Sequence, residues 1–316
     1  MQENNYLPPL LLQNGHFNTI FRTVFTNPQI HYQRKRTNTP DHDFLDLDFS
    51  IVGSDKIIII VHGLEGSSQS KYVISNALFF NRNDYDICAI NLRGCSGEMN
   101  KLYSSYHSGK TDDLDIVIKE IESNYQEIIL LGYSLGGNLV IKYGGEKGSS
   151  INSKIKNILA VSVPADLTDS AKELAKPKNF LYQYVFMQSL RKKLKEKIEL
   201  FPESGLSIIE VAKIKNFKQF DDVYTSVAHG FKNADDYWRK NSCKQFIQDI
   251  KIPSLMLNAL DDPFLGKKCY PFEQAKNNPF FTLETPKYGG HVGFNISYNN
   301  YKNNWLENRI MKFINN

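Results

Sequence analysis

Residues 56–61 read Lys-Ile-Ile-Ile-Ile-Val, an uninterrupted run of mostly β-branched apolar side chains. A strand of this kind is apolar on both faces, which is typical of a parallel sheet that is covered by helices on each side. Similar runs follow in the chain, the last of them weaker, and between them lie helical patterns such as residues 111–122. This alternation predicts an α/β fold with a mostly parallel central sheet and helices on both faces. The further predicted strands cover residues 85–92, 127–133, 158–163, 254–258 and 280–284.

The alternation stops between about residues 164 and 249, where the pattern is helical and rich in Lys, Phe and Tyr. We expect a single domain over residues 1–316, with a helical cap insertion at about 164–249 that covers the carboxyl edge of the sheet. The aromatic side chains of this segment either line an apolar pocket or form the cap's own core. They include Phe180, Tyr182, Tyr184, Phe186 and Phe217.

One short motif, Gly132-Tyr133-Ser134-Leu135-Gly136, directly follows a predicted strand and directly precedes a helical pattern at residues 138–143. The G-x-S-x-G pattern in this context is typical of a nucleophile elbow. A sharp strand-to-helix turn strains the serine backbone, and the flanking glycines let neighbouring chain approach closely. The serine hydroxyl then projects above the sheet at a helix N-terminus, whose dipole favours developing negative charge. Ser134 is therefore the candidate nucleophile.

A serine hydroxyl needs a base within hydrogen-bonding reach and a third group that orients the base. In this arrangement the acid and then the histidine follow the serine along the chain, which leaves His229 and His291. His291 is favoured because it follows the last predicted strand in a glycine-flanked loop, whereas His229 lies in the cap. The acid is expected just after residues 254–258. Asp261 and Asp262 are the two candidates, and the position of Asp262 next to Pro263 favours it. In that case we expect Asp261 to face solvent or to cap backbone.

Hydrolysis through such a serine also needs two donors for the oxyanion of the tetrahedral intermediate. One is expected to be the backbone N–H of Leu135, the residue after the nucleophile. The other is expected to be the N–H of Leu64, in the loop His62-Gly63-Leu64-Glu65-Gly66 that follows the first predicted strand. His62 itself is more consistent with a structural hydrogen-bonding role than with a base.

Composition and charge argue against several other classes of protein. The formal net charge of +4 is small for 316 residues, so we expect no nucleic-acid partner. No apolar stretch approaches the roughly 20 residues of a membrane helix, and no signal-peptide core is evident, so we expect a cytoplasmic protein without an integral membrane segment. The basic run at residues 191–195 is interpreted as a solvated helix face, with contact to anionic lipid or to substrate as the alternative. Peripheral membrane contact and the oligomeric state thus stay open.

The four cysteines form no C-x-x-C pair, which argues against a zinc ribbon or a redox site. We expect them to be reduced, with Cys88 a small core residue in a strand. The sequence also has no H-x-x-x-H motif or acidic cluster, and its glycine-rich loops lack the spacing of nucleotide-binding motifs. We therefore expect neither a metal nor a cofactor.

Several motifs in one order extend over almost the whole chain, and together they resemble one family. That family is the YheT-like branch of α/β-hydrolases, related to the eukaryotic ABHD1-ABHD2-ABHD3-type hydrolases and also called the AB hydrolase-4 family. One departure is His42, which stands where the family pattern has glycine, in a predicted surface turn. The motifs are residues 12–19, 39–44, 62–68, 91–98 and 106–109, the elbow with Asn138, residues 261–264, and residues 289–294.

The resemblance implies Ser134 as nucleophile, Asp262 as acid and His291 as base. It further implies an α/β-hydrolase fold and hydrolysis of carboxylic esters, with short- to medium-chain acyl esters or monoacylglycerols as substrates. The expected binding partner is therefore a small-molecule ester substrate. Two alternatives remain: acyl transfer to an alcohol through the same intermediate, and a catalytically silent binding module on the same scaffold.

Overall fold

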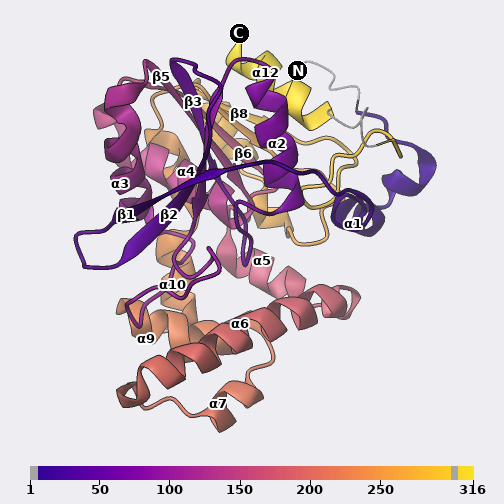
Figure 1. The fold of residues 1–316 in the computed structure, drawn as a ribbon. Helices are drawn as coiled ribbons and strands as arrows, with labels where there is room; N and C mark the ends of the chain where they lie inside the picture. Colours follow the sequence, from indigo (N-terminus) through magenta and orange to yellow (C-terminus); the bar gives the residue numbers. More distant parts are fainter. Residues whose placement is uncertain (1–5, 300–304) are drawn as a thin grey trace.

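A computed structural model describes residues 6–299 and 305–316 as an eight-stranded sheet with helices on both faces and a helical insertion (Figure 1). The strand order is β1-β2-β4-β3-β5-β6-β7-β8. The pairs β1–β2 and β2–β4 are antiparallel and all other neighbours are parallel, so the predicted α/β class with a mostly parallel sheet is confirmed. The strands are β1 (Gln33–Asn38), β2 (Phe44–Ser50), β3 (Lys56–Val61), β4 (Asp86–Asn91), β5 (Glu127–Tyr133), β6 (Ile155–Val161), β7 (Ser254–Leu257) and β8 (Phe281–Glu284).

The two faces of β3 belong to two separate cores, as its uninterrupted apolar run predicts. Ile57, Ile59 and Val61 point into one core, which is closed by α3 (Thr111–Ile121) and α4 (Leu135–Lys147). Ile58 and Ile60 point into the other, which is closed by α2 (Lys71–Asn81) and α12 (Trp305–Ile314). Burial on both faces fixes β3 in the middle of the molecule. The position of the loop that follows its carboxyl end is therefore fixed as well.

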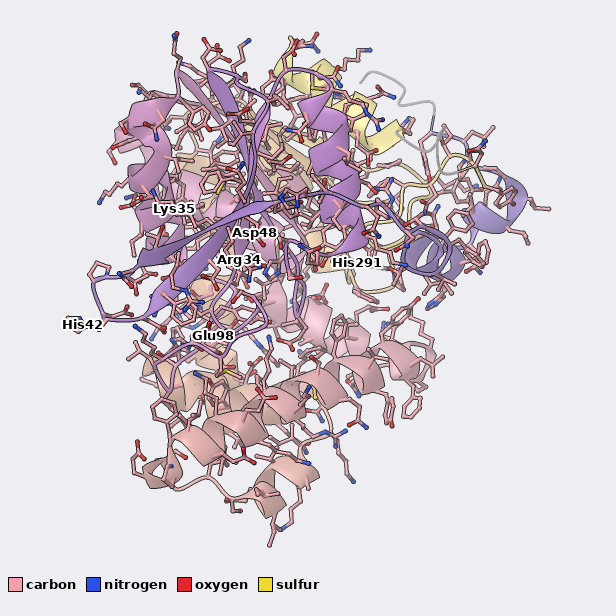
Figure 2. The ribbon with its side chains drawn as sticks, in the orientation of Figure 1. Arg34, Lys35, His42, Asp48, Glu98 and His291 are labelled. Atoms are coloured by element: carbon pink, nitrogen blue, oxygen red, sulfur yellow. The ribbon has the colours of Figure 1, made fainter. Side chains whose placement is uncertain are left out.

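The N-terminal hairpin of β1 and β2 was not predicted, and its charged residues explain why. β1 reads Gln-Arg-Lys-Arg-Thr-Asn and is largely exposed at the sheet edge. Arg34 lies opposite Asp48 (Figure 2) and binds its carboxylate with two hydrogen bonds of 2.7 and 2.8 Å. Arg36 binds the carboxylate of Asp46 in the same way. His42 lies in the exposed turn between the strands with φ of 66°, a conformation that glycine adopts more readily.

The chain between β6 and β7 is helical in every described element, and Figure 1 shows it gathered at one end of the sheet. A small core of its own holds it together, with Met187, Leu190 and Leu194 of α6 packed against Val211 and Phe220. Its elements are α5 (Leu167–Leu174), η4 (Pro177–Asn179), α6 (Phe180–Leu200), η5 (Pro202–Ser204), α7 (Ile208–Lys213), α8 (Phe217–Phe220), η6 (Asp221–Thr225), α9 (Ser226–His229), α10 (Ala234–Asn241) and η7 (Cys243–Asp249). The remaining helices are η1 (Leu10–Gln13), α1 (Gly15–Phe25), η2 (Glu122–Asn124), η3 (Gly148–Ser150), η8 (Lys267–Cys269) and α11 (Phe272–Asn277).

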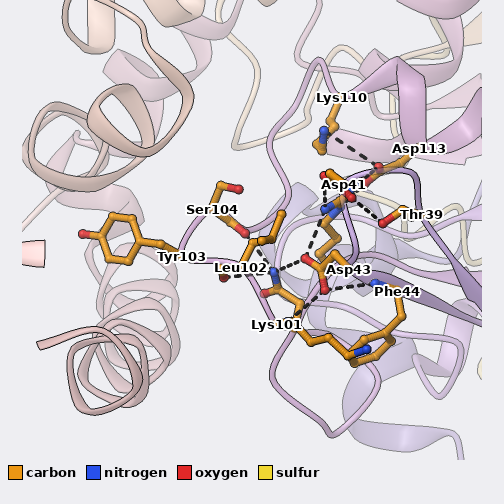
Figure 3. A network of polar contacts seen from close by, with 12 residues as sticks. Thr39, Asp41, Asp43, Phe44, Lys101, Leu102, Tyr103, Ser104, Lys110 and Asp113 are labelled. Atoms are coloured by element: carbon orange, nitrogen blue, oxygen red, sulfur yellow. Dashed lines mark hydrogen bonds and ion pairs between the residues drawn. The ribbon is translucent and has the colours of Figure 1, made fainter. Parts of the chain in front are cut away.

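A buried guanidinium joins the start of β2, the loop after β4 and the first turn of α3 (Figure 3). Arg93 binds both carboxylate oxygens of Asp113 at 2.8 and 2.6 Å. Its other end reaches Asp41 at 2.8 Å and the fully buried Asp43 at 3.1 Å. Asn100 donates to Asp43 as well, which ties the long loop after β4 into the same network.

Replacing Arg93 with Met should destabilise the fold by about 3 to 5 kcal/mol, because two buried carboxylates would lose their cation. Urea unfolding measures this change. Arg82→Met, at an exposed arginine, is the matched control and should be close to neutral. Equal unfolding midpoints for the two variants would contradict a structural role for the network.

Candidate active site

Ser134 occupies a strained turn between β5 and α4, in the strand-turn-helix context that its motif predicts. Its φ of 51° and ψ of −115° lie outside the usual regions for a residue with a side chain. The glycines on either side are required by space. A Cβ on Gly132 would lie 2.2 Å from the carbonyl oxygen of Gly136, and one on Gly136 would lie 2.2 Å from that of Val61.

The structure brings the three predicted side chains together from loops after three different strands. His291 Nε2 lies 2.9 Å from Ser134 Oγ, and His291 Nδ1 lies 2.9 Å from Asp262 Oδ2. Asp262 is buried, and its other carboxylate oxygen accepts a hydrogen bond of 2.9 Å from the amide of Phe264. The carboxylate therefore holds Nδ1 as the protonated nitrogen and leaves Nε2 free to accept from the serine hydroxyl.

The competing histidine, His229, is directed elsewhere. Its ring packs against His107 with centroids 4.5 Å apart. Burial and the charges of Lys110 and Arg93 lower the pKa of His229 to about 4. A neutral, buried ring in the cap is consistent with the preference for His291.

Three backbone hydrogen bonds hold the loop that carries His291. The amide of His291 donates to Thr19 Oγ1 of α1, that of Gly290 to Asp261 Oδ1, and that of Val292 to Ser162 Oγ, each at 2.8 Å. Thr19 and Ser162 were missed by the sequence reasoning as positioning residues. Thr19 ends the first family motif, which was the one available signal for it.

Asp261 and Asp262 are neighbours with different tasks. Asp261 caps the backbone of Gly290, which is one of the two positions that the sequence left open for it. Partial burial, together with the nearby charge of Asp262, raises the pKa of Asp261 to about 6, although the Gly290 amide counteracts this rise. Ionisation of Asp261 in the folded protein therefore lowers its stability.

The loop after β3 passes directly beside the serine. A Cβ on Gly63 would lie 3.2 Å from Ser134 Cβ, and both Leu64 and Leu135 border the cavity into which Ser134 opens. His62 has a structural position, because its Nδ1 donates to the Gly63 carbonyl at 2.7 Å and its Nε2 accepts from the Leu92 amide at 3.1 Å. Complete burial lowers the pKa of His62 to about 4, so the ring is neutral.

Glu65, the residue after Leu64, links this loop to the cap. Its backbone has φ of 56°, and its carboxylate accepts from Tyr106 Oη at 2.7 Å and from Ser189 Oγ. Lys193 Nζ of α6 lies 2.9 Å from the same carboxylate. The expected solvated basic face is thus correct for Lys192 and Lys195, which are exposed, and wrong for Lys193, which turns inward to neutralise a buried charge.

The cavity extends from Ser134 and His291 under the cap and is largely apolar. Two of the five cap aromatics line it, whereas Phe180 and Tyr184 are exposed and Tyr182 packs against Phe264 with ring centroids 4.8 Å apart. The predicted aromatic pocket and the cap core are therefore both partly correct. Apolar lining residues include Leu174, Phe186, Leu190, Phe217, Phe220 and Trp238.

The described residues also show the state of the cysteines and whether a metal site or a membrane-spanning helix is present. The four cysteines are all free and buried, with Cys88 in β4. Residues 6–299 and 305–316 contain no group of three or more His, Cys, Asp or Glu side chains arranged to hold a metal ion. Within the same residues, no helix combines the length and apolar character needed to cross a bilayer.

Asp261→Asn should change how stability depends on pH. The pKa of this carboxyl is raised in the fold, so its favourable contribution is complete at low pH and is lost as the pH rises through about 6. The asparagine keeps the acceptor for Gly290 but cannot ionise, so the variant should gain stability relative to the parent from pH 4 upward. Urea unfolding across this range measures the gain. The exposed control Asp55→Asn should run parallel to the parent, and an equally parallel Asp261→Asn curve would contradict the raised pKa.

Comparison with known proteins identifies the family and the fold. The family model for the alpha/beta hydrolase fold matches residues 56–294. YheT of Escherichia coli (strain K12) is 27% identical, covering 96% of this chain and 91% of its own. Phospholipase ABHD3 of Homo sapiens is 30% identical over 92% of this chain and 73% of its own, and the monoacylglycerol lipase of Saccharomyces cerevisiae is 29% identical over 81% and 58%.

Solved structures with the same architecture include the esterase Pf2001 of Pyrococcus furiosus. It superimposes with a TM-score of 0.59 at 17% identity, covering 91% of each chain, which is a likeness of fold. The matched family model and the relatives that align over more than nine tenths of this chain lead to one conclusion. This chain belongs to the α/β-hydrolase family, in the YheT-like branch that includes the ABHD3 type.

Proposed function

We propose that this protein is a serine carboxylic ester hydrolase that works through an acyl-enzyme intermediate. The observation that carries the proposal is the 2.9 Å contact between His291 Nε2 and Ser134 Oγ, with Asp262 on the opposite ring nitrogen. A neutral imidazole in that position can take the hydroxyl proton as the oxygen attacks an ester carbonyl.

The proposed reaction has two halves. Ser134 Oγ bonds to the carbonyl carbon while His291 takes its proton, and the amides of Leu64 and Leu135 bind the resulting oxyanion. His291 then gives the proton to the departing alcohol as the ester bond breaks, which leaves the acyl group on Ser134. Water attacks this ester with His291 again as base, the bond between the acyl carbon and Ser134 Oγ breaks as His291 returns the proton to that oxygen, and the acid is released. Asp262 holds the imidazole in one tautomer and stabilises its cationic form.

The cavity supports an acyl ester as substrate. Its lining is mostly aliphatic and aromatic, and such a lining favours a hydrocarbon chain by removing it from water. The relatives are named esterase for YheT, phospholipase for ABHD3 and monoacylglycerol lipase for the yeast protein, and these names point to the same class. We therefore propose short- to medium-chain acyl esters or monoacylglycerol-like lipids as substrates.

Among p-nitrophenyl esters from acetate to palmitate, turnover should peak at intermediate chain length.

Ser134→Ala should lower the kcat for p-nitrophenyl butyrate by about 10⁴-fold or more, because the hydroxyl forms the covalent intermediate. A fluorophosphonate probe should label the parent and fail to label the variant. Ser153→Ala, at an exposed serine, is the control and should keep full activity and labelling. Unchanged turnover in Ser134→Ala would refute the nucleophile, and a parent that neither turns over nor is labelled would favour a silent binding module.

A further inference from the structure

The outward stripe of α6 changes character halfway along the helix. In its first two turns the exposed residues are apolar, with Leu181 73% and Val185 64% exposed, and Phe180 and Tyr184 lie beside them. Further along the same stripe the exposed residues are Lys192 and polar side chains, as on an ordinary solvated helix. A helix face that met only water would be polar along its whole length. The exposed apolar residues at the beginning of α6 therefore indicate a surface with another contact.

A second exposed apolar segment lies against the first. The ring of His16 in α1 stacks on Tyr182 of α6 with centroids 5.7 Å apart, and Figure 1 shows α1 on the same side of the molecule as the beginning of α6. On α1, Ile20 and Val24 are exposed, and in η1 Leu10 is 80% exposed. We call this combined surface the docking face: Leu7, Leu10, Leu11, Ile20, Val24, Phe180, Leu181, Tyr184 and Val185.

The docking face borders the candidate active site. Thr19 of α1 binds the amide of His291, and Tyr182 packs on Phe264, whose ring lies 4.2 Å from that of His291. In Figure 2, His291 is labelled close to α1. A surface that touched the docking face would thus lie beside the catalytic histidine rather than across the molecule from it.

The chain segments that form the docking face carry no acidic side chain of their own. Residues 7–26 and 176–190 contain no aspartate or glutamate. Lys176 and Lys178 stand at the beginning of α6 and share the side chain of Glu173, and Lys71 Nζ donates to the Thr23 carbonyl of α1. Lysines at the edge of an apolar helical surface complement anionic lipid head groups.

We propose that the docking face binds the surface of an anionic lipid bilayer, so that the site draws its ester substrate from the membrane. The supply of an ester from the membrane rests on the proposed ester hydrolysis, whereas binding to the bilayer does not. Apolar side chains would enter the head-group region while the lysines remain at the level of the phosphates. A lipid ester leaving the bilayer would then meet the cavity next to His291.

Co-sedimentation with vesicles tests the proposal without any turnover. The full chain should sediment with vesicles of phosphatidylcholine containing about one third phosphatidylglycerol, and more weakly with phosphatidylcholine alone or at high salt. The double variant Leu10→Ser with Leu181→Ser should lose about tenfold or more in partition onto the anionic vesicles. The matched control, Ile209→Ser with Val227→Ser, removes similarly exposed side chains from α7 and α9 and should bind as the parent does.

Hydrolysis of water-soluble p-nitrophenyl butyrate, measured on the same samples, should be unchanged in both double variants. If the parent itself did not hydrolyse p-nitrophenyl butyrate, that result would count against the proposed function and not against docking. Docking would be overturned by a parent that sediments with neither vesicle, or by an equal loss in the control pair. It would also be overturned by a concentration-dependent dimer in sedimentation velocity that the leucine variant abolishes, since a second copy would then cover the face.

Discussion

The placement of His291 depends on three hydrogen bonds from consecutive backbone amides, and the site exists only while they hold. Their acceptors come from α1, from the loop after β6 and from the loop after β7. Val292 and Phe294 in this loop have positive φ angles, which such residues adopt only when the surroundings impose them. The ring is thus fixed by contacts with elements distant in sequence, and its 2.9 Å approach to Ser134 follows from that fixation.

The opposite wall of the site is attached to the cap. Glu65 follows Leu64 directly, and its buried carboxylate is neutralised by Lys193 of α6. A buried ion pair of this kind contributes little net stability but is costly to break, so it fixes the geometry of the groups it joins. The cap consequently does more than cover the cavity, because a shift of α6 would pull on the loop that approaches the serine.

The sequence was sufficient for those features that have a local signature. The strands buried on both faces were predicted from uninterrupted apolar runs, although β6 begins at Ile155 and ends at Val161 instead of spanning residues 158–163. The candidate site was predicted from a motif and from chain order. β1 and β2 escaped because their buried aspartates are neutralised by arginines on the neighbouring strand, a pairing that no local pattern reveals. Thr19 escaped as a positioning residue for a similar reason, because it meets His291 across 272 residues of chain.

Asp261 and Asp262 offer a matched pair of substitutions that separates contact with the imidazole from capping of the backbone. Both remain amide acceptors when changed to asparagine, but only Asp262 contacts the imidazole. The decisive measurement is kcat for p-nitrophenyl butyrate in Asp262→Asn beside Asp261→Asn. We predict a fall in kcat of about 10³- to 10⁴-fold for Asp262→Asn and of less than about tenfold for Asp261→Asn. Equal rates in the two variants, or the larger loss in Asp261→Asn, would contradict the assembly of Ser134, His291 and Asp262 as one unit.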